Sequence, residues 1–484
     1  MKNIVLLVMD TARYDYVSNS DVAPNINQLA DNGTDYTSSF SAAPWTLPSH
    51  ASIFSGQYPS KHGSNAAAKR FNPSSPSFVE ALQNSGYETI GVSNNTWISE
   101  EFGFDRGFTT FYKNWQYIQS GMDPITTTRK YDGKDRIIQL IKEVVDGNPL
   151  VNFSNTFYAL LQKKRIADDG ARSTNEWISQ RLSNRDRSNP LFLFVNYFEP
   201  HLEYRPPKEY TKQFLPDEVS YNEAMEVEQD AFRYIAGDLE MDLKDFEILR
   251  SLYRGELSYL DMRIGELVDI FKAAGEWDDT VLIILGDHGE NIGEHSLMDH
   301  QYCLYDTLLH VPLVIHGGEF MGGETVDDLV QLTDIAPTIL DIAGVEGSGI
   351  TDKMQGESFH PASDATPRKY LYAEYMAPQP SIEALEKRIN DISEDVYEYD
   401  RSIRMVRDKN WKYIRYSDGT EELYDLQSDI GELANLVGSC QDVVDEYNDK
   451  LDDWLRRFEE DDENTDANMS ENIQGRLEDL GYLQ

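Results

Sequence analysis

Four acidic and imidazole side chains come shortly after apolar segments that are far apart in the chain: Asp10, His201, Asp287 and His288. Carboxylates and imidazoles form a mixed oxygen and nitrogen ligand set, which suits Mg²⁺, Mn²⁺, Ca²⁺ or Zn²⁺, and the lack of a thiolate among them excludes a sulfur-rich site. Taken singly, Asp10 can cap the segment after its strand, and Asp287-His288 can belong to an ordinary turn. Their shared position after apolar segments favours a divalent-cation site.

The stretch 43–63 places a hydroxyl side chain where a helix is expected to begin. The residues after Thr46 predict a helix over 47–55, closed by Gly56, with Pro48 tolerated in the first turn. Free amides and the helix dipole favour negative charge at this end, and a cation touching the hydroxyl lowers its pKa further. Thr46 is therefore a candidate nucleophile, or alternatively a purely structural N-cap.

Several other side chains of this stretch favour the chemical interpretation of Thr46. Trp45, His50, Lys61 and His62 lie close to it in the sequence, and a structural cap requires none of them. We therefore expect His50 to act in catalysis and Lys61 and His62 to bind an anion.

Alternating strand and helix patterns predict an α/β sandwich with a mainly parallel sheet. Five apolar runs predict buried strands: 4–9, 87–92, 191–195, 281–285 and 311–315. Three helical patterns lie between them: 24–32, 78–84 and 253–271. Ligands collect beyond the carboxyl ends of the strands in such sheets, which is where the four side chains above are expected.

The chain changes character near residue 366, where we divide it into a catalytic domain, 1–365, and a C-terminal subdomain, 366–484. The subdomain pattern predicts an antiparallel meander with strands at 404–406, 411–416 and 422–424. It also predicts a helix over 443–458, a mobile acidic run over 459–464 and a terminal helical segment over 476–483. The irregular stretches 113–180 and 205–245 are interpreted as insertions over one edge of the main sheet.

The composition limits the possible partners and compartments. The chain has 85 acidic and 43 basic residues, for a formal net charge of −42, which argues against nucleic acid and anionic membranes as partners. Because the acidic residues are spread along the chain, they favour a high-salt cytoplasm over a cation-binding or basic-partner surface. The two cysteines, the short N-terminal apolar run and the lack of an apolar span predict a cytoplasmic protein.

In their order along the chain, these motifs resemble the sulfatase family of the alkaline phosphatase superfamily. The resemblance covers most of the chain: 3–10, 24–26, 43–63, 199–201, 252–267, 286–295, 305–315, 422–426 and 432–436. It implies a three-layer α/β sandwich with a small C-terminal four-stranded antiparallel sheet.

The resemblance also implies roles for individual residues. It implies one divalent cation held by Asp10, Asp287 and His288, in contact with a nucleophile at Thr46. His201 would face the ester as an acid or an anion contact, and His300 lies near the place of a basic group in many relatives. Asn94, near the place of a missing lysine-containing element, and His295 are further expected anion contacts.

This chain departs from the family at the nucleophile. Sulfatases carry Cys or Ser there, which is oxidised to formylglycine, whereas the Cβ methyl of Thr46 prevents formation of that aldehyde. The Arg expected four residues later is His50, and Thr11 replaces a possible acidic ligand. The resemblance is therefore to a Thr-nucleophile, haloarchaeal-type member without formylglycine.

These features predict a metal-dependent hydrolase of a small anionic sulfate or phosphate ester, mono- or diester, derived from a glycan or a lipid. The alternatives are a phosphoglycerol- or phosphoethanolamine-transferase-like enzyme and a non-catalytic anion- or metal-binding homologue. The identity of the ester and of the metal, a second metal near His201, His295 and His300, and the oligomeric state stay open at this point.

Overall fold

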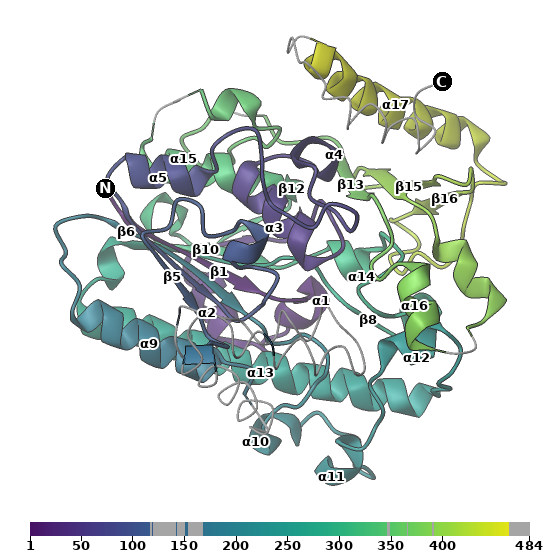
Figure 1. Cartoon of the computed structure of the whole chain (residues 1–484), viewed down its shortest axis with the longest axis horizontal. Coiled ribbons are helices and arrows are strands. Elements are labelled where there is room, and N and C mark those ends of the chain that lie inside the picture. Colours follow the sequence, from purple (N-terminus) through teal and green to yellow (C-terminus); the bar gives the residue numbers. More distant parts are fainter. Residues whose placement is uncertain are drawn as a thin grey trace.

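A mixed eight-stranded sheet forms the centre of the protein (Figure 1). The computed structural model describes residues 1–116, 119, 142, 151–152, 168–345, 349–364, 366–389 and 392–463. Across the sheet the strands follow in the order β11 (Glu324–Val326), β2 (Thr34–Tyr36), β10 (Leu313–His316), β7 (Thr280–Gly286), β1 (Asn3–Met9), β6 (Leu191–Tyr197), β4 (Glu88–Ser93) and β5 (Thr110–Lys113). The strands from β7 to β5 are parallel, whereas β10 runs antiparallel to both of its neighbours.

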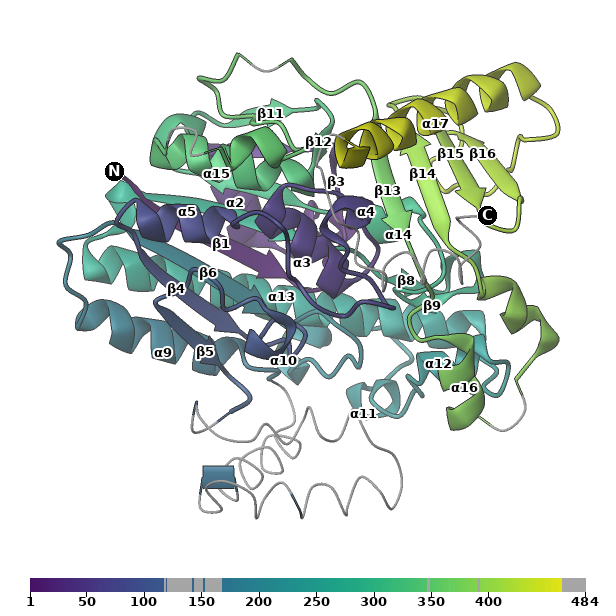
Figure 2. The ribbon, with the colours of Figure 1, turned by 45° about the horizontal axis from the view of Figure 1, so that its top comes forward.

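The two faces of the sheet pack into separate hydrophobic cores. Along β1, Ile4, Leu6 and Val8 enter one core, whereas Val5, Leu7 and Met9 enter the other. Helices α3 (Thr46–Ser55), α5 (Phe78–Asn84) and α15 (Ile335–Ala343) cover the first face, and α2 (Pro24–Asn32), α9 (Ala171–Ser183) and α13 (Leu243–Ala274) cover the second (Figure 1). Figure 2 shows α5 and α15 above the strands and α9 and α13 below them. Because both faces are buried, the central strands are continuously apolar, and the expected three-layer sandwich is confirmed.

The long helix α13 also fixes the loop that follows β1. A capping box between Asp242 and Asp245 starts the helix, and Gly275 ends it with a φ of 67°. From its middle, the Tyr253 hydroxyl donates to the carbonyl of Thr11 at 2.8 Å and accepts from the Arg13 amide at 3.0 Å. The residues directly after Asp10 are thus tied to a rigid element.

A four-stranded antiparallel sheet and a helix form the C-terminal part. It consists of β13 (Leu371–Tyr375), β14 (Ile403–Arg407), β15 (Trp411–Tyr416), β16 (Glu421–Asp425) and α17 (Gln441–Glu463). The expected acidic run 459–464 differs from the structure, because α17 continues to Glu463. The expected helical segment 476–483 lies outside the described residues.

A buried ion cluster joins the small sheet to the main domain. Lys412 on β15 is fully buried, 2.8 Å from Asp306 Oδ1 and 2.7 Å from Glu432 Oε1. Arg407 on β14 contacts the other oxygen of Asp306 at 2.5 Å. Since Asp306 begins α14 (Asp306–Leu309) in the main domain, this cluster holds the two parts together.

The remaining α-helices and strands of the described residues are short. They are α1 (Tyr14–Val17), β3 (Ser39–Phe40), α4 (Pro59–His62), α10 (Lys208–Thr211), α11 (Tyr221–Ala224), α12 (Ala231–Ile235), β8 (Asn291–Ile292), β9 (Met298–Asp299), β12 (Val330–Gln331) and α16 (Ile382–Arg388). In the part of the chain that the structure describes, no helix combines the length and hydropathy needed to cross a bilayer. Most of the expected insertion 113–180 lies outside the described residues.

Candidate active site

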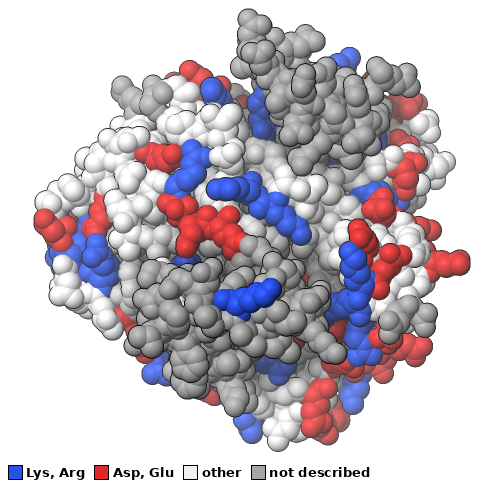
Figure 3. All heavy atoms as spheres, in the orientation of Figure 1, with Lys and Arg blue, Asp and Glu red and all other residues white. Residues whose placement is uncertain are grey.

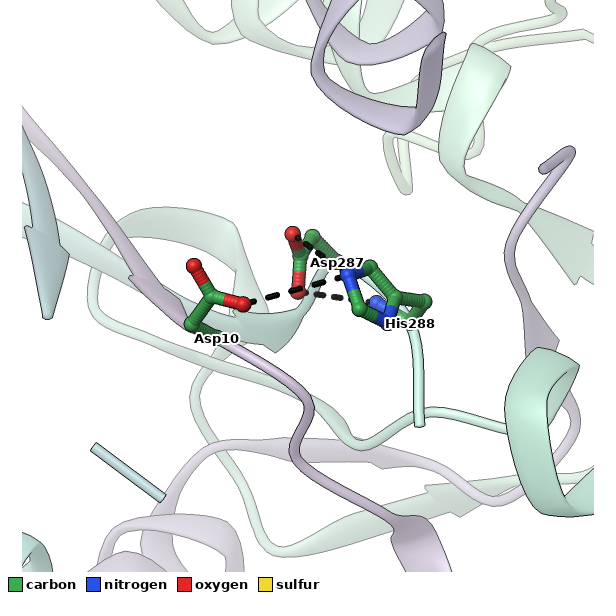
Figure 4. A group of neighbouring side chains, drawn as sticks. All are labelled: Asp10, Asp287 and His288. Carbon is green, nitrogen blue, oxygen red and sulfur yellow. Dashed lines mark hydrogen bonds and ion pairs between the residues drawn. The ribbon is translucent and has the colours of Figure 1, made fainter. Parts of the chain in front are cut away.

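Three of the predicted ligands meet at the carboxyl end of the two central strands (Figure 4). Because Met9 of β1 pairs with Gly286 of β7, the residues that follow, Asp10 and Asp287-His288, reach the same point. We call these three residues the triad; their ligand atoms all lie within 4.8 Å of one another. His288 Nε2 is 3.8 Å from Asp10 Oδ1 and 3.4 Å from Asp287 Oδ2.

The hydrogen bonding of the triad fits a divalent cation. Within the part of the chain that the structure describes, Asp10 Oδ1 and Asp287 Oδ2 are buried without a hydrogen-bond partner, which is costly for carboxylates unless a positive charge compensates. His288 donates from Nδ1 to the carbonyl of Gly289 at 2.9 Å, so the lone pair of Nε2 faces the two carboxylates. Two anionic oxygens and a neutral imidazole nitrogen, oriented by a backbone carbonyl, make a suitable ligand set.

The two carboxyl groups of the triad differ in their electrostatics. Burial raises the pKa of Asp10, and the nearby charge of Asp287 raises it further. Burial also opposes the charge of Asp287, but His288 and His50 lower the pKa of that carboxyl to about 2. The pKa of His288 is lowered to about 3 by burial. A bound cation would favour the ionised carboxylates and the neutral imidazole.

Thr46 faces the triad as the first residue of α3. The predicted N-cap role of Thr46 is wrong, because the N-cap is Trp45 and its extended backbone places Thr46 one position inside the helix. The Thr46 hydroxyl lies 3.3 Å from His288 Nε2, and that nitrogen can only accept because Nδ1 carries the proton. The hydroxyl is thus directed at a predicted cation ligand instead of at its own helix.

His50 ties α3 to the loop after β7. Its Nδ1 lies 2.9 Å from the carbonyl oxygen of Thr46 and 3.4 Å from Asp287 Oδ2. Both partners are acceptors, so Nδ1 carries a proton. Ser49 adds a hydrogen bond from its hydroxyl to the carbonyl of Asp287 at 2.7 Å. His50 therefore lies where it can position both Thr46 and Asp287.

Asn95 is a site residue that the sequence analysis missed. Its Nδ2 donates to Asp10 Oδ2 at 2.5 Å and lies 3.5 Å from Thr46 Oγ1. The Trp97 amide donates to Asn95 Oδ1, which fixes the orientation of the side-chain amide. The predicted anion contact, Asn94, instead accepts a hydrogen bond from Thr174 of α9. The available sequence signal was the position of Asn95 just after the strand β4.

A second group of ligand-type side chains lies beside the triad. Glu290, Asp299 and His300 present ligand atoms within 4.8 Å of one another. The centroid of the His300 ring lies 4.6 Å from that of the His288 ring and 5.1 Å from that of the His201 ring. The structure therefore brings the predicted residues His201 and His300 to the triad, together with two carboxylates that the sequence analysis did not select.

Two of the predicted anion contacts, His62 and His295, interact with side chains outside the triad. His62 on α4 lies 3.1 Å from the hydroxyl of Ser52 and accepts from the Ser64 amide, and burial lowers its pKa to about 3. The His295 ring stacks on Tyr305 with 3.7 Å between centroids. Lys61, on the same short helix as His62, is partly exposed.

Comparisons with known proteins identify the family of the chain. The chain matches the family model for sulfatases over residues 2–345 and the model "N-sulphoglucosamine sulphohydrolase, C-terminal" over residues 293–460. Arylsulfatase K of Bos taurus is 25% identical over 477 residues, which cover 93% of this chain and 81% of the relative. Choline-sulfatase of Rhizobium meliloti (strain 1021) is 24% identical over 462 residues, with coverages of 88% and 79%.

The phosphonate monoester hydrolase of Agrobacterium radiobacter has a similar fold, with a TM-score of 0.68 at 18% identity and coverage of 94% of this chain and 96% of that one. The sulfatase family model spans well over half of this chain and includes Thr46 and the whole triad. The chain therefore belongs to the sulfatase family and is an ester-hydrolysing enzyme.

Proposed function

We propose that this enzyme hydrolyses a sulfate or phosphate ester with Thr46 as its nucleophile and one divalent cation held by Asp10, Asp287 and His288. The observation that carries the proposal is the Thr46 hydroxyl, 3.3 Å from His288 Nε2 and beside two buried carboxylate oxygens that accept no hydrogen bond from the described residues. A cation at the triad would lower the pKa of this hydroxyl and offset negative charge on the ester.

Individual side chains then take separate roles in the reaction. Thr46 Oγ1 bonds to the sulfur or phosphorus after its proton passes to solvent, and the bond to the leaving-group oxygen breaks. That oxygen takes a proton from solvent, and His201 and His300 lie beside the ester as its contacts. Water next attacks the same sulfur or phosphorus, breaks its bond to Thr46 Oγ1 and releases sulfate or phosphate.

Phosphate esters, including diesters, suit this mechanism better than sulfate esters. A threonine ester cannot collapse to an aldehyde, so the second step needs direct attack at the central atom. Phosphoryl transfer proceeds well by positioning and charge neutralisation alone. Aryl phosphate, bis-aryl phosphate and aryl sulfate assayed in parallel with each divalent ion would rank the substrates, and a dominant sulfatase activity would contradict our preference.

The substitution Thr46→Ala tests the nucleophile. We expect kcat to fall by about three orders of magnitude or more, because removal of an essential nucleophile disables the whole mechanism. The matched control is Ser55→Ala in the same helix, whose hydroxyl donates to the carbonyl of Ala51, and it should keep its activity. Unchanged turnover of a folded, metal-loaded Thr46→Ala variant would refute the proposal.

A further inference from the structure

Four buried carboxylates lie together at the carboxyl edge of the sheet: Asp10, Asp287, Glu290 and Asp299, at most 7% exposed. Among the described residues, the ion pairs of these side chains are with histidines, and none is with lysine or arginine. Buried carboxylates need compensating charge. One divalent cation offsets two of the four negative charges and a protonated His300 one more, and an anionic ester adds further negative charge.

The two carboxylates outside the triad are arranged around an imidazole. Strands β8 and β9 pair antiparallel, with Asn291 opposite Asp299, and this brings Glu290 next to Asp299. His300 Nδ1 lies 3.5 Å from Glu290 Oε1 and also contacts Asp299 Oδ1. Two carboxylate oxygens thus converge on one imidazole nitrogen, the same donor types as in the triad.

His201 provides an independent indication of a ligand at this place. Its Nδ1 donates to the carbonyl of Leu202 at 2.5 Å, which leaves the lone pair of Nε2 free, and Nε2 makes no hydrogen bond within the described residues. An imidazole that is oriented by a backbone carbonyl in this way is prepared to bind a metal. Its ring lies 5.1 Å from that of His300.

Glu290 is itself held in place by neighbours that do not compete for its second oxygen. The Tyr204 hydroxyl donates to Glu290 Oε2 at 2.6 Å, and the Thr11 hydroxyl lies 3.5 Å from the same atom. This leaves Glu290 Oε1 for the cluster. Thr11 directly follows Asp10, so the two groups of ligands share a rigid connection.

We propose that Glu290, Asp299 and His300, with His201 as fourth ligand, hold a second divalent cation beside the triad. Two imidazoles among the four ligands favour Zn²⁺ or Mn²⁺ over Ca²⁺. This inference rests on the proposed function for the cation at the triad. Two neighbouring cations can stabilise both the attacking and the leaving oxygen of a transferred group, which gives the second site a role in leaving-group departure.

Metal stoichiometry tests the second site without an activity assay. The full chain, stripped with a chelator and reloaded with Mn²⁺, should bind about two equivalents, and the two ions should give an exchange-coupled electron paramagnetic resonance signal. Asp299→Asn and Glu290→Gln should bind about one equivalent and lose the coupling. The control Glu294→Gln removes a carboxylate of the same segment that pairs with Arg13, and it should keep both ions.

Near-ultraviolet circular dichroism identifies variants that fold, and Asp299→Glu, which retains a carboxylate, provides a second variant that should regain the second ion. A single equivalent in the wild-type chain at saturating Mn²⁺, or two coupled ions in folded Asp299→Asn, would overturn the proposal. A failure of the proposed nucleophile can be distinguished from these outcomes. If Thr46→Ala stays active, Thr46 is not the nucleophile, but the number of Mn²⁺ ions bound per chain does not change.

Discussion

At the scale of single residues, the candidate site depends on side chains that are oriented by the backbone. His288 is fixed by the carbonyl of Gly289, and Asn95 by the amide of Trp97. Each of these bonds decides which atom faces the reactants: the lone pair of His288 Nε2 and the N–H groups of Asn95. The site therefore needs little rearrangement to bind a cation and an ester.

Asn95 should be the most sensitive position outside the triad and Thr46. Replacing it by alanine leaves Asp10 Oδ2 without its described partner and removes a contact to Thr46, so we expect kcat/KM to fall about 100-fold, as for other preorganised donors. Asn94→Ala serves as the neighbouring control and should change kcat/KM only slightly. A larger loss in Asn94→Ala than in Asn95→Ala would contradict this role.

The sequence predicted Asp10, Thr46, Asp287 and His288 because strand ends and a helix start can be recognised from local patterns. It could not predict Asn95, whose contacts depend on how β4 lies beside β6 and β1. Glu290 and Asp299 were also missed. The two-residue strands β8 and β9 that bring them together are too short to produce a pattern.

At the scale of elements, the buried ion cluster around Lys412 determines how the small sheet is attached. Replacing Lys412 by methionine leaves Asp306 and Glu432 facing each other without their shared cation. We expect the free energy of unfolding to fall by about 3–5 kcal/mol, as for other broken buried ion pairs. Denaturant titration of the full chain measures this change.

The matched control for that experiment is Lys409→Met, on the turn before the same strand. Lys409 pairs with Asp327, and both side chains are largely exposed, at 44% and 83%, so its loss should cost less than about 1 kcal/mol. Equal effects of the two substitutions would show that the buried cluster does not hold the sheet.

The elements also show where sequence patterns are sufficient. Helix α2 has the predicted bounds, 24–32, because a proline starts it and Gly33 ends it. The run 311–315 correctly indicated a buried strand, but β10 begins at Leu313 and runs antiparallel to β7. An apolar run records burial and not direction, so the reversal at this position could not be predicted.

At the scale of the whole molecule, the dominant electrostatic feature is the formal net charge of −42. On the face drawn in Figure 3, acidic and basic side chains lie interspersed. Repulsion among so many negative charges destabilises the folded state. Salt weakens this repulsion, because the screening length falls from about 10 Å at 0.1 M to about 3 Å at 1 M. We propose that the protein is adapted to high salt.

The thermal midpoint should therefore rise steadily between 0.1 M and 2 M KCl. Parallel titration with choline chloride separates screening from specific binding of K⁺, since both salts screen charge equally. A midpoint that is highest at low ionic strength would contradict salt adaptation.

The distance along the chain between Asp10 and Asp287 has a consequence for biosynthesis. Asp10 is translated first, and its partners Asp287 and His288 on the neighbouring strand follow only 277 residues later. Until then the nascent chain carries an incomplete set of ligands and has little affinity for a metal ion. With the proposed cation, loading would follow translation of His288, so the ion would stabilise only late steps of folding.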